Sequence, residues 1–215
     1  RGFSRVARTD KMRNYTPPAG KLENRVILLT GEGDRLGRWM AKTFAEYCAT
    51  IILLGRTIKK LEAVYDEIEK AVHPQPAIYP MNLEGATAKD YEELAAKIEK
   101  EFGRLDGLVH NAAQAGAITP VQSYDAETWY KLMQVNLNAP FLLTQACLEL
   151  LKASPDAAVI FVGDNKTRAY WGAYGASKVA LKGFMKILAD ELEENTSVRA
   201  NCLDPGPLRT KLRAN

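Results

Sequence analysis

The sequence has few of the side chains that usually bind metals or form disulfides. Its 215 residues include three cysteines, Cys48, Cys147 and Cys202, and two histidines, His73 and His110. The cysteines are widely spaced and form no Cys-x-x-Cys pair, which favours buried thiols in a reducing compartment over disulfides or zinc. We therefore expect a cytoplasmic protein with no bound metal.

Long apolar runs and a strong net charge are also absent. The apolar stretches are short and interrupted, far below the roughly 18 residues of a membrane span, so we expect no membrane partner. The formal net charge is only +3, which gives no reason to expect nucleic acid as a partner. With 47% hydrophobic and 26% charged residues, the composition is typical of one globular domain.

The first 20 residues differ in character from the rest of the chain. They are rich in arginine and end in the breaker segment 17–20 (PPAG), so we predict a basic arm or linker over residues 1–20 and the folded domain over residues 21–215. The arm could be the remnant of a transit peptide, an expression remnant or a segment that packs on a partner. A further hypothesis is an arm over residues 1–16 that binds nucleic acid or a membrane surface.

From residue 25 onward, short apolar runs alternate with amphipathic stretches. The pattern predicts strands over residues 26–29, 51–54, 77–82, 107–110, 158–162 and 197–203. It predicts helices over residues 37–48, 59–72, 88–102, 128–151 and 174–192, the fourth being one helix or a helix pair bent near Pro140. This alternation indicates an α/β fold with a parallel sheet covered by helices on both faces. Ligands of such folds bind at the carboxyl ends of the strands.

A glycine-rich turn, residues 30–37 (TGEGDRLG), joins the first predicted strand to the first helix. Glycines permit a tight turn and a close backbone approach, and a helix N-terminus offers unpaired N–H groups to a pyrophosphate. The alternative is a strand-to-helix turn without a ligand. Its place after the first strand of a βαβ chain favours nucleotide binding.

The second predicted strand ends in Gly55-Arg56. An acidic residue at this point would bind the ribose 2′-hydroxyl of NAD, whereas an arginine suits the 2′-phosphate of NADP. We therefore predict NADP(H) in preference to NAD(H), although Arg56 could also be a solvated loop charge.

Tyr174 and Lys178 are four residues apart in a predicted helix, so their side chains share one face. A free tyrosine has a pKa of about 10, and a neighbouring ammonium would lower that pKa by stabilising the phenolate. Tyr174 would then be a usable general acid and base. The same spacing also arises by chance on many surface helices.

These features, taken in order, resemble the short-chain dehydrogenase/reductase family over residues 22–211. The resemblance rests on Thr30-Gly31 and Gly37, Asn111-Ala112, Asn136, Tyr174 with Lys178, and Pro205-Gly206 with Thr210. Within the family the chain is most similar to bacterial YciK-type oxidoreductases, through residues 54–56 (LGR), 104–107 (RLDG), 133–136 (MQVN) and 171–178 (WGAYGASK).

The resemblance implies a single Rossmann-type, doubly wound domain that moves hydride between a nicotinamide and a small carbonyl or alcohol substrate. It also implies a homodimer or homotetramer, formed through the helices within residues 125–151 and 174–192. The family continues through a substrate lid and a seventh strand beyond this point, so for the 215 residues given we expect a sheet without that strand and lid.

The resemblance also implies roles for individual residues. Tyr174 would exchange the proton at the substrate oxygen, Lys178 would lower the pKa of Tyr174 and bind the nicotinamide ribose, and Asn136 would support a water beside Lys178. Asn136 could instead satisfy a helix backbone, and Thr210 could be a helix cap rather than a carboxamide contact. The implied cofactor-binding set is Thr30, Gly31, Gly33, Arg35, Leu36, Gly37, Arg56, Asn82, Leu83, Asn111, Ala112, Ala113, Tyr174, Lys178, Pro205, Gly206 and Thr210.

The chain departs from the family pattern at three positions. Arg35 replaces the middle glycine of the turn, where it would either obstruct the pyrophosphate or bind it. Ala113 replaces a glycine, which is a milder change. Asp164 falls nearest the position of the family's catalytic serine; ionised, it cannot donate a hydrogen bond and would repel a developing alkoxide. Asn165 or Thr167 could be donors instead. These departures favour an alternative hypothesis, a catalytically impaired nucleotide-binding or scaffold protein.

Overall fold

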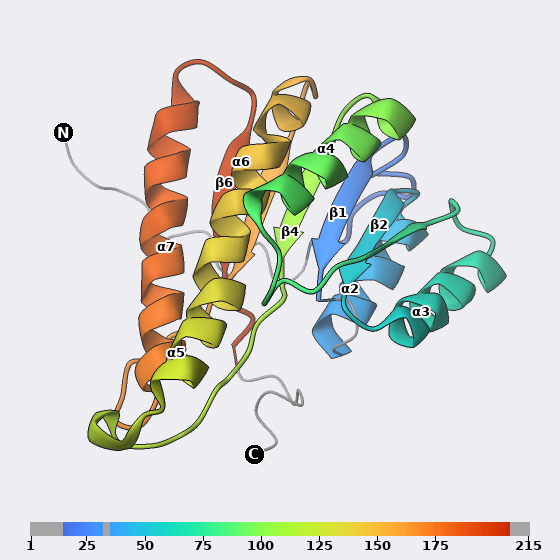
Figure 1. Ribbon diagram of the computed structural model, residues 1–215. Helices are drawn as coiled ribbons and strands as arrows, with labels where there is room; N and C mark the ends of the chain where they lie inside the picture. Colours follow the sequence, from blue (N-terminus) through green and yellow to red (C-terminus); the bar gives the residue numbers. More distant parts are fainter. Residues whose placement is uncertain (1–14, 32–34, 207–215) are drawn as a thin grey trace.

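The computed structural model describes residues 15–31 and 35–206. In these residues six parallel strands form one sheet in the order β3-β2-β1-β4-β5-β6 (Figure 1). The strands are β1 (Val26–Thr30), β2 (Thr50–Gly55), β3 (Ala77–Pro80), β4 (Gly107–His110), β5 (Ala158–Val162) and β6 (Arg199–Leu203). The helices are α2 (Arg35–Glu46), α3 (Ile58–Lys70), α4 (Ala88–Phe102), α5 (Ala126–Met133), α6 (Ala139–Lys152) and α7 (Gly172–Glu193), with the 3-10 turn η1 (Val121–Ser123) and the π-helical turn η2 (Gln134–Asn138).

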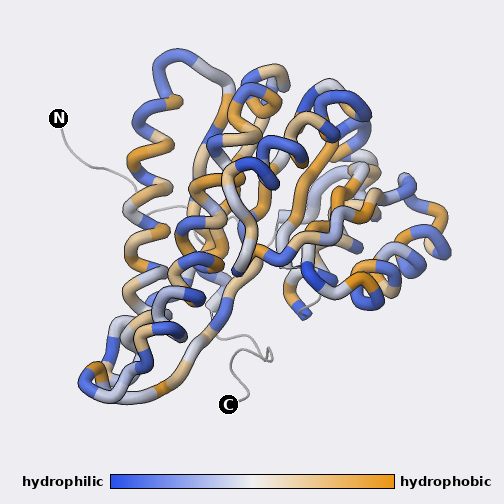
Figure 2. Tube along the Cα trace, in the orientation of Figure 1, coloured by the Kyte–Doolittle hydropathy of each residue, from blue (hydrophilic) through white to orange (hydrophobic). Residues whose placement is uncertain are grey.

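The helices cover both faces of the sheet, as the alternating pattern predicts. Helices α2 and α3 pack on one face, and α4, α6 and α7 pack on the other (Figure 1). Figure 2 shows apolar strands between helices whose apolar stripes are interrupted by polar residues. The burial of these stripes on a two-sided apolar sheet is the main source of stability for such a fold. The expected α/β, Rossmann-type single domain is therefore confirmed.

The parallel register brings several loops to one edge of the sheet. Thr30 pairs with Leu54 in β2, and Val162 pairs with Leu203 in β6. Since all neighbouring strands run the same way, the segments that follow β1, β2, β4, β5 and β6 emerge together. This carboxyl edge is where the fold can assemble a ligand site.

The predicted and observed helix boundaries agree where the capping interactions are strong. The predicted and observed bounds of α4 coincide, because Thr87 and Asp90 form a capping box at its start and Gly103 ends it with a φ of 72°. Helix α2 begins and ends two residues earlier than predicted. Cys48 takes a φ of 72°, which is incompatible with a continuing helix, so the helix stops before it.

The predicted helix over residues 128–151 is interrupted in its middle by η2. Pro140, at the start of α6, has no backbone N–H to donate to the preceding turn, and the chain widens there into a π turn. The bend expected near Pro140 thus takes the form of a π turn, which turns the Asn136 side chain into the protein interior.

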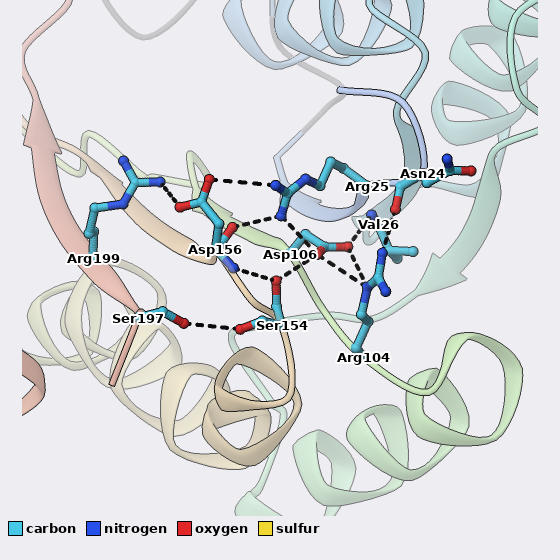
Figure 3. Close-up of polar contacts among 9 residues, drawn as sticks. All are labelled: Asn24, Arg25, Val26, Arg104, Asp106, Ser154, Asp156, Ser197 and Arg199. Carbon is cyan, nitrogen blue, oxygen red and sulfur yellow. Dashed lines mark hydrogen bonds and ion pairs between the residues drawn. The ribbon is translucent and has the colours of Figure 1, made fainter. Parts of the chain in front are cut away.

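A polar network closes the opposite, amino edge of the sheet around the buried Asp106 (Figure 3). Its carboxylate accepts hydrogen bonds from Ser154 Oγ at 2.6 Å and from the Val26 N–H at 2.9 Å, and it pairs with Arg25 and Arg104, each at 3.2 Å. Burial raises the pKa of Asp106, but these hydrogen bonds and the Arg104 charge outweigh it, so the net pKa lies below its ordinary value. The network joins β1, β4 and the segment before β5.

In the described part of the chain, no helix has the length and apolar character that crossing a membrane requires. The same residues contain no group of three or more histidine, cysteine or acidic side chains placed to hold a metal ion. Cys48, Cys147 and Cys202 are all free thiols.

Candidate active site

A cleft with a cavity volume of about 230 Å³ opens at the carboxyl edge of the sheet. Most of the predicted site residues line it together: Gly31, Leu36, Arg56, Asn82, Leu83, Asn111, Ala112, Ala113, Asp164, Tyr174, Lys178, Pro205 and Gly206. The cleft is also lined by residues that the sequence did not indicate: Leu54, Gly55, Thr57, Lys60, Met81, Gln114, Val135, Val162 and Gly163. Gly33 and Thr210, two further predicted residues, lie outside the described residues.

The glycine turn is held against the end of β4. Thr30 is buried and does not reach the cleft; its Oγ1 donates to the Val109 carbonyl at 3.3 Å and accepts from the N–H groups of Asn111 and Ala112, both at 3.1 Å. Gly31 has a φ of 75°, and a Cβ there would lie 2.6 Å from the Cα of Ala112. Only glycine fits this position, so the backbone itself forms the cleft wall.

Arg35 and Gly37 lie on α2 beside the turn. Gly37 is buried against the sheet, whereas Arg35 is the first residue of α2 and has an exposed side chain. Neither is among the described residues that line the cleft. Leu36 is the described residue of α2 that lines it.

Two basic residues line the cleft where β2 is followed by α3. Arg56 follows the strand, and Lys60 lies four residues on, within the first turn of the helix whose N-cap position is Thr57. The N-terminus of a helix adds a partial positive charge at the same place. No spacing rule in the sequence pointed to Lys60, because Arg56 precedes the helix that carries Lys60.

Tyr174 and Lys178 lie on the buried face of α7, each with 4% of its surface exposed. The Lys178 Nζ donates to the Val162 carbonyl at 2.8 Å and lies 5.7 Å from the centre of the Tyr174 ring. Burial lowers the pKa of Lys178 to about 8, and the nearby negative charge of Asp164 opposes that shift. The predicted shared face is therefore observed, and the ammonium remains mostly protonated at neutral pH.

Asp164 stands directly at the Tyr174 phenol. The Tyr174 Oη donates to Asp164 Oδ2 at 3.0 Å, while Asp164 Oδ1 accepts from the Asn165 N–H at 2.7 Å. The Asn165 side chain is engaged elsewhere, donating to Asp204 Oδ2 at 2.6 Å. Neither Asn165 nor Thr167, the alternative donors, is among the described residues that line the cleft.

Asn136 lies behind the cleft and is fully buried. Its Oδ1 accepts from the Gln114 N–H at 2.8 Å, and its Nδ2 donates to the Gln114 carbonyl at 2.9 Å and to Ser177 Oγ at 3.1 Å. Asn136 thus satisfies a loop backbone and not the helix backbone that sequence analysis considered. Gln114 in turn donates from its side chain to Glu84 at 3.0 Å. No pattern in the sequence connects Gln114 with Glu84, because the contact depends on two loops.

Known proteins share this fold and much of this sequence. The model of the short chain dehydrogenase family matches residues 25–215. The uncharacterised oxidoreductase YciK of Escherichia coli K12 is 41% identical over 205 residues, which cover 94% of this chain and 81% of YciK. A short chain dehydrogenase structure from Pseudomonas syringae has a TM-score of 0.91 and 49% identity, with 94% of this chain and 84% of that chain covered. One from Shigella flexneri 2a, solved in complex with NADP, has a TM-score of 0.86 and 41% identity, with 90% and 81% covered.

Proposed function

The chain belongs to the short-chain dehydrogenase family, and on that basis we propose that it is an NADP(H)-dependent oxidoreductase acting on a carbonyl or alcohol substrate. The predicted likeness to YciK-type oxidoreductases is confirmed by the match to YciK. The observation that carries the proposal is the placement of Tyr174 and Lys178 together on the cleft wall, at the carboxyl edge of the sheet.

The residues of the cleft fit NADP(H). The Shigella relative was solved with NADP. In this chain Gly31 packs against Ala112, where any Cβ would collide, and its backbone lines the cleft in which a pyrophosphate would lie. Arg56 and Lys60, with the N-terminus of α3, offer a positive site for a 2′-phosphate. The bound nicotinamide would supply hydride to the substrate carbon, or accept hydride from it.

Tyr174 is the residue that would move the proton. Its phenol oxygen gives a proton to the substrate oxygen when a carbonyl is reduced, and takes one when an alcohol is oxidised. The buried Lys178 ammonium stabilises negative charge on that phenol oxygen, and this stabilisation is stronger than in water because the pair is shielded from solvent. Asn136 contributes by holding the Gln114 backbone of the cleft wall in place.

The contact between Asp164 and Tyr174 favours a second candidate function. An ionised carboxylate accepts the phenolic hydrogen and repels negative charge that develops on a substrate oxygen. With such a group at the reacting end, the cleft would bind NADP(H) without turnover. The protein would then be a nucleotide-binding sensor or scaffold within the same family.

One set of measurements separates the two functions. We expect the full chain to bind NADPH and to reduce members of a panel of ketones and aldehydes. In Tyr174→Phe, kcat should fall by about 100-fold or more, because a general acid contributes that much, while the Kd for NADPH stays within about twofold. Tyr170→Phe is the matched control, because Tyr170 is exposed and lies only four residues earlier.

Each result has a clear meaning. Full activity in Tyr174→Phe would reject Tyr174 as the proton donor. Binding of NADPH without turnover of any substrate would favour the sensor or scaffold. If neither NADPH nor NADH binds, the oxidoreductase and the nucleotide sensor are both rejected, and only the scaffold remains. Arg56→Ala should weaken NADPH binding by about tenfold while leaving NADH binding unchanged, because only NADPH carries the 2′-phosphate.

The proposal extends to assembly and compartment. Apolar side chains are exposed on the outer surfaces of α6 and α7, namely Phe141, Val179 and Ile187, and they suit a homodimer or homotetramer. A cytoplasmic location agrees with the free thiols and with the proposed use of NADPH. Light scattering of the full chain tests the assembly, and a monomer at micromolar concentration would reject it.

A further inference from the structure

The single phenolic hydrogen of Tyr174 is already used within the protein. It is donated to Asp164 Oδ2, 3.0 Å away. The Lys178 ammonium and the Asp164 carboxylate also attract each other electrostatically. Hydrogen bonds to a charged acceptor are about twice as strong as those between neutral groups. The oxygen of a plain ketone therefore competes poorly with Asp164 for this hydrogen.

The Asp164 carboxylate is held in its position by neighbouring loops. The Asn165 N–H binds its other oxygen at 2.7 Å. The Asn165 side chain connects to Asp204 at 2.6 Å, and Asp204 accepts from the Gly206 N–H at 2.9 Å. The segment after β5 is thus tied to the segment after β6, so Asp164 presents a fixed negative acceptor to the cleft that it lines.

We infer that the substrates of this site carry a hydrogen-bond donor, a hydroxyl or a protonated amine, on the carbon next to the reacting carbonyl or carbinol. Groups on neighbouring carbons can reach Asp164 and Tyr174 together, because the interacting oxygens of these residues are only 3.0 Å apart. The substrate donor replaces Tyr174 as the partner of Asp164, and the Tyr174 hydrogen becomes available to the substrate oxygen. A carboxylate at the same place is repelled by Asp164, and an ether oxygen gives it no hydrogen.

This inference rests on the proposed oxidoreductase function, and three aryl ketones test it. They are 2-hydroxyacetophenone, 2-methoxyacetophenone and phenylglyoxylate, which place a donor, an ether and a carboxylate beside the same type of carbonyl. With NADPH, kcat/KM should be about tenfold or more higher for the hydroxy ketone than for the methoxy ketone, as one charged hydrogen bond implies. Phenylglyoxylate should be reduced most slowly.

Variants at Asp164 provide the decisive comparison. In Asp164→Ser the ratio of hydroxy to methoxy ketone should fall towards one, and phenylglyoxylate reduction should rise. Asp164→Asn, which keeps the shape of the side chain, should behave in the same direction if the serine variant folds poorly. Asp66→Ser is the matched control, since Asp66 is exposed on α3 and is not among the described residues that line the cleft. A ratio near one in the parent, or an unchanged ratio in both Asp164 variants, overturns the inference.

A binding measurement distinguishes failure of the inference from failure of the proposed function. Isothermal titration calorimetry can follow titration of each ketone into the protein saturated with NADP⁺. If neither these three ketones nor any member of the panel of ketones and aldehydes is reduced, the proposed function fails, and the ratio of Kd values for the hydroxy and methoxy ketones still decides the inference. If all three are reduced and bound equally, the function stands and the inference is wrong.

Discussion

Among single residues, Lys178 is a proposed catalytic side chain whose pKa is changed by its burial. Its ammonium is removed from water and donates a hydrogen bond to the Val162 carbonyl. Burial lowers its pKa to about 8 from an ordinary value of 10.5. The sequence could predict its spacing from Tyr174, because helix periodicity fixes which side chains share a face. It could not predict the hydrogen bond from Tyr174 to Asp164, which depends on the path of the loop after β5.

The lowered pKa predicts how stability depends on pH. Between about pH 8 and 10.5 the unfolded chain keeps the Lys178 proton while the folded protein has lost it, so the folded state gains stability as the pH rises. Compared with Lys178→Met, in which this group cannot titrate, the parent should gain up to about 3 kcal/mol of unfolding free energy over that range. Urea unfolding of both proteins at several pH values checks this, and a constant difference between them would contradict it.

At the level of elements, the positions of helices and strands were predictable and the shape of the helix pair α5 and α6 was only partly so. The apolar pattern predicts β4, β5 and α4 at their observed bounds. The two strands are buried apolar runs, and α4 has a strong cap at each end. Pro140 predicts a bend, but not the π turn of η2 that aims Asn136 at Gln114. That contact, like the contact of Gln114 with Glu84, forms between elements distant in the sequence.

The π turn therefore predicts different costs for two neighbouring asparagines. Asn136→Ala leaves the partly buried N–H and carbonyl of Gln114 without their side-chain partner, and should lower the unfolding free energy by about 2–4 kcal/mol. Asn138→Ala, in the same turn but exposed, should cost less than about 1 kcal/mol. Urea unfolding gives both values, and hydrogen exchange of the Gln114 N–H should accelerate only in Asn136→Ala. Equal stability of the two variants would show that Asn136 does not hold the cleft wall.

On the scale of the whole molecule, the residues proposed to act in function and a network that stabilises the fold lie at opposite edges of the sheet. The cleft occupies the carboxyl edge, and the network around Asp106 occupies the amino edge (Figure 3). The parallel order of the sheet was predictable from the alternation of elements, and it explains why the cleft residues converge. The network was not predictable, because its members come from distant positions that meet only after the strands pair.

This separation predicts that Asp106 affects folding but leaves the cleft unchanged. Removing its charge in Asp106→Asn leaves Arg25 and Arg104 without a buried partner, and since both arginines are partly exposed the cost should be about 2–3 kcal/mol. Asp156→Asn is the matched control, because Asp156 pairs with Arg25 and Arg199 but is 55% exposed, and should cost less than about 1 kcal/mol. The Kd for NADPH should stay the same in both variants.

Acid should remove the difference between the parent and Asp106→Asn. The pKa of Asp106 is lowered in the folded state, so its contribution is present above the ordinary aspartate pKa of about 4 and is lost as the pH falls through the folded value. Urea unfolding from neutral to acid pH should show the unfolding free energies of the two proteins converging. At neutral pH, by contrast, the difference between their unfolding free energies should persist at high salt, because the carboxylate is buried. A gap that stays constant into acid, or an Asp106→Asn protein as stable as Asp156→Asn, would mean that packing and not this network secures the amino edge of the sheet.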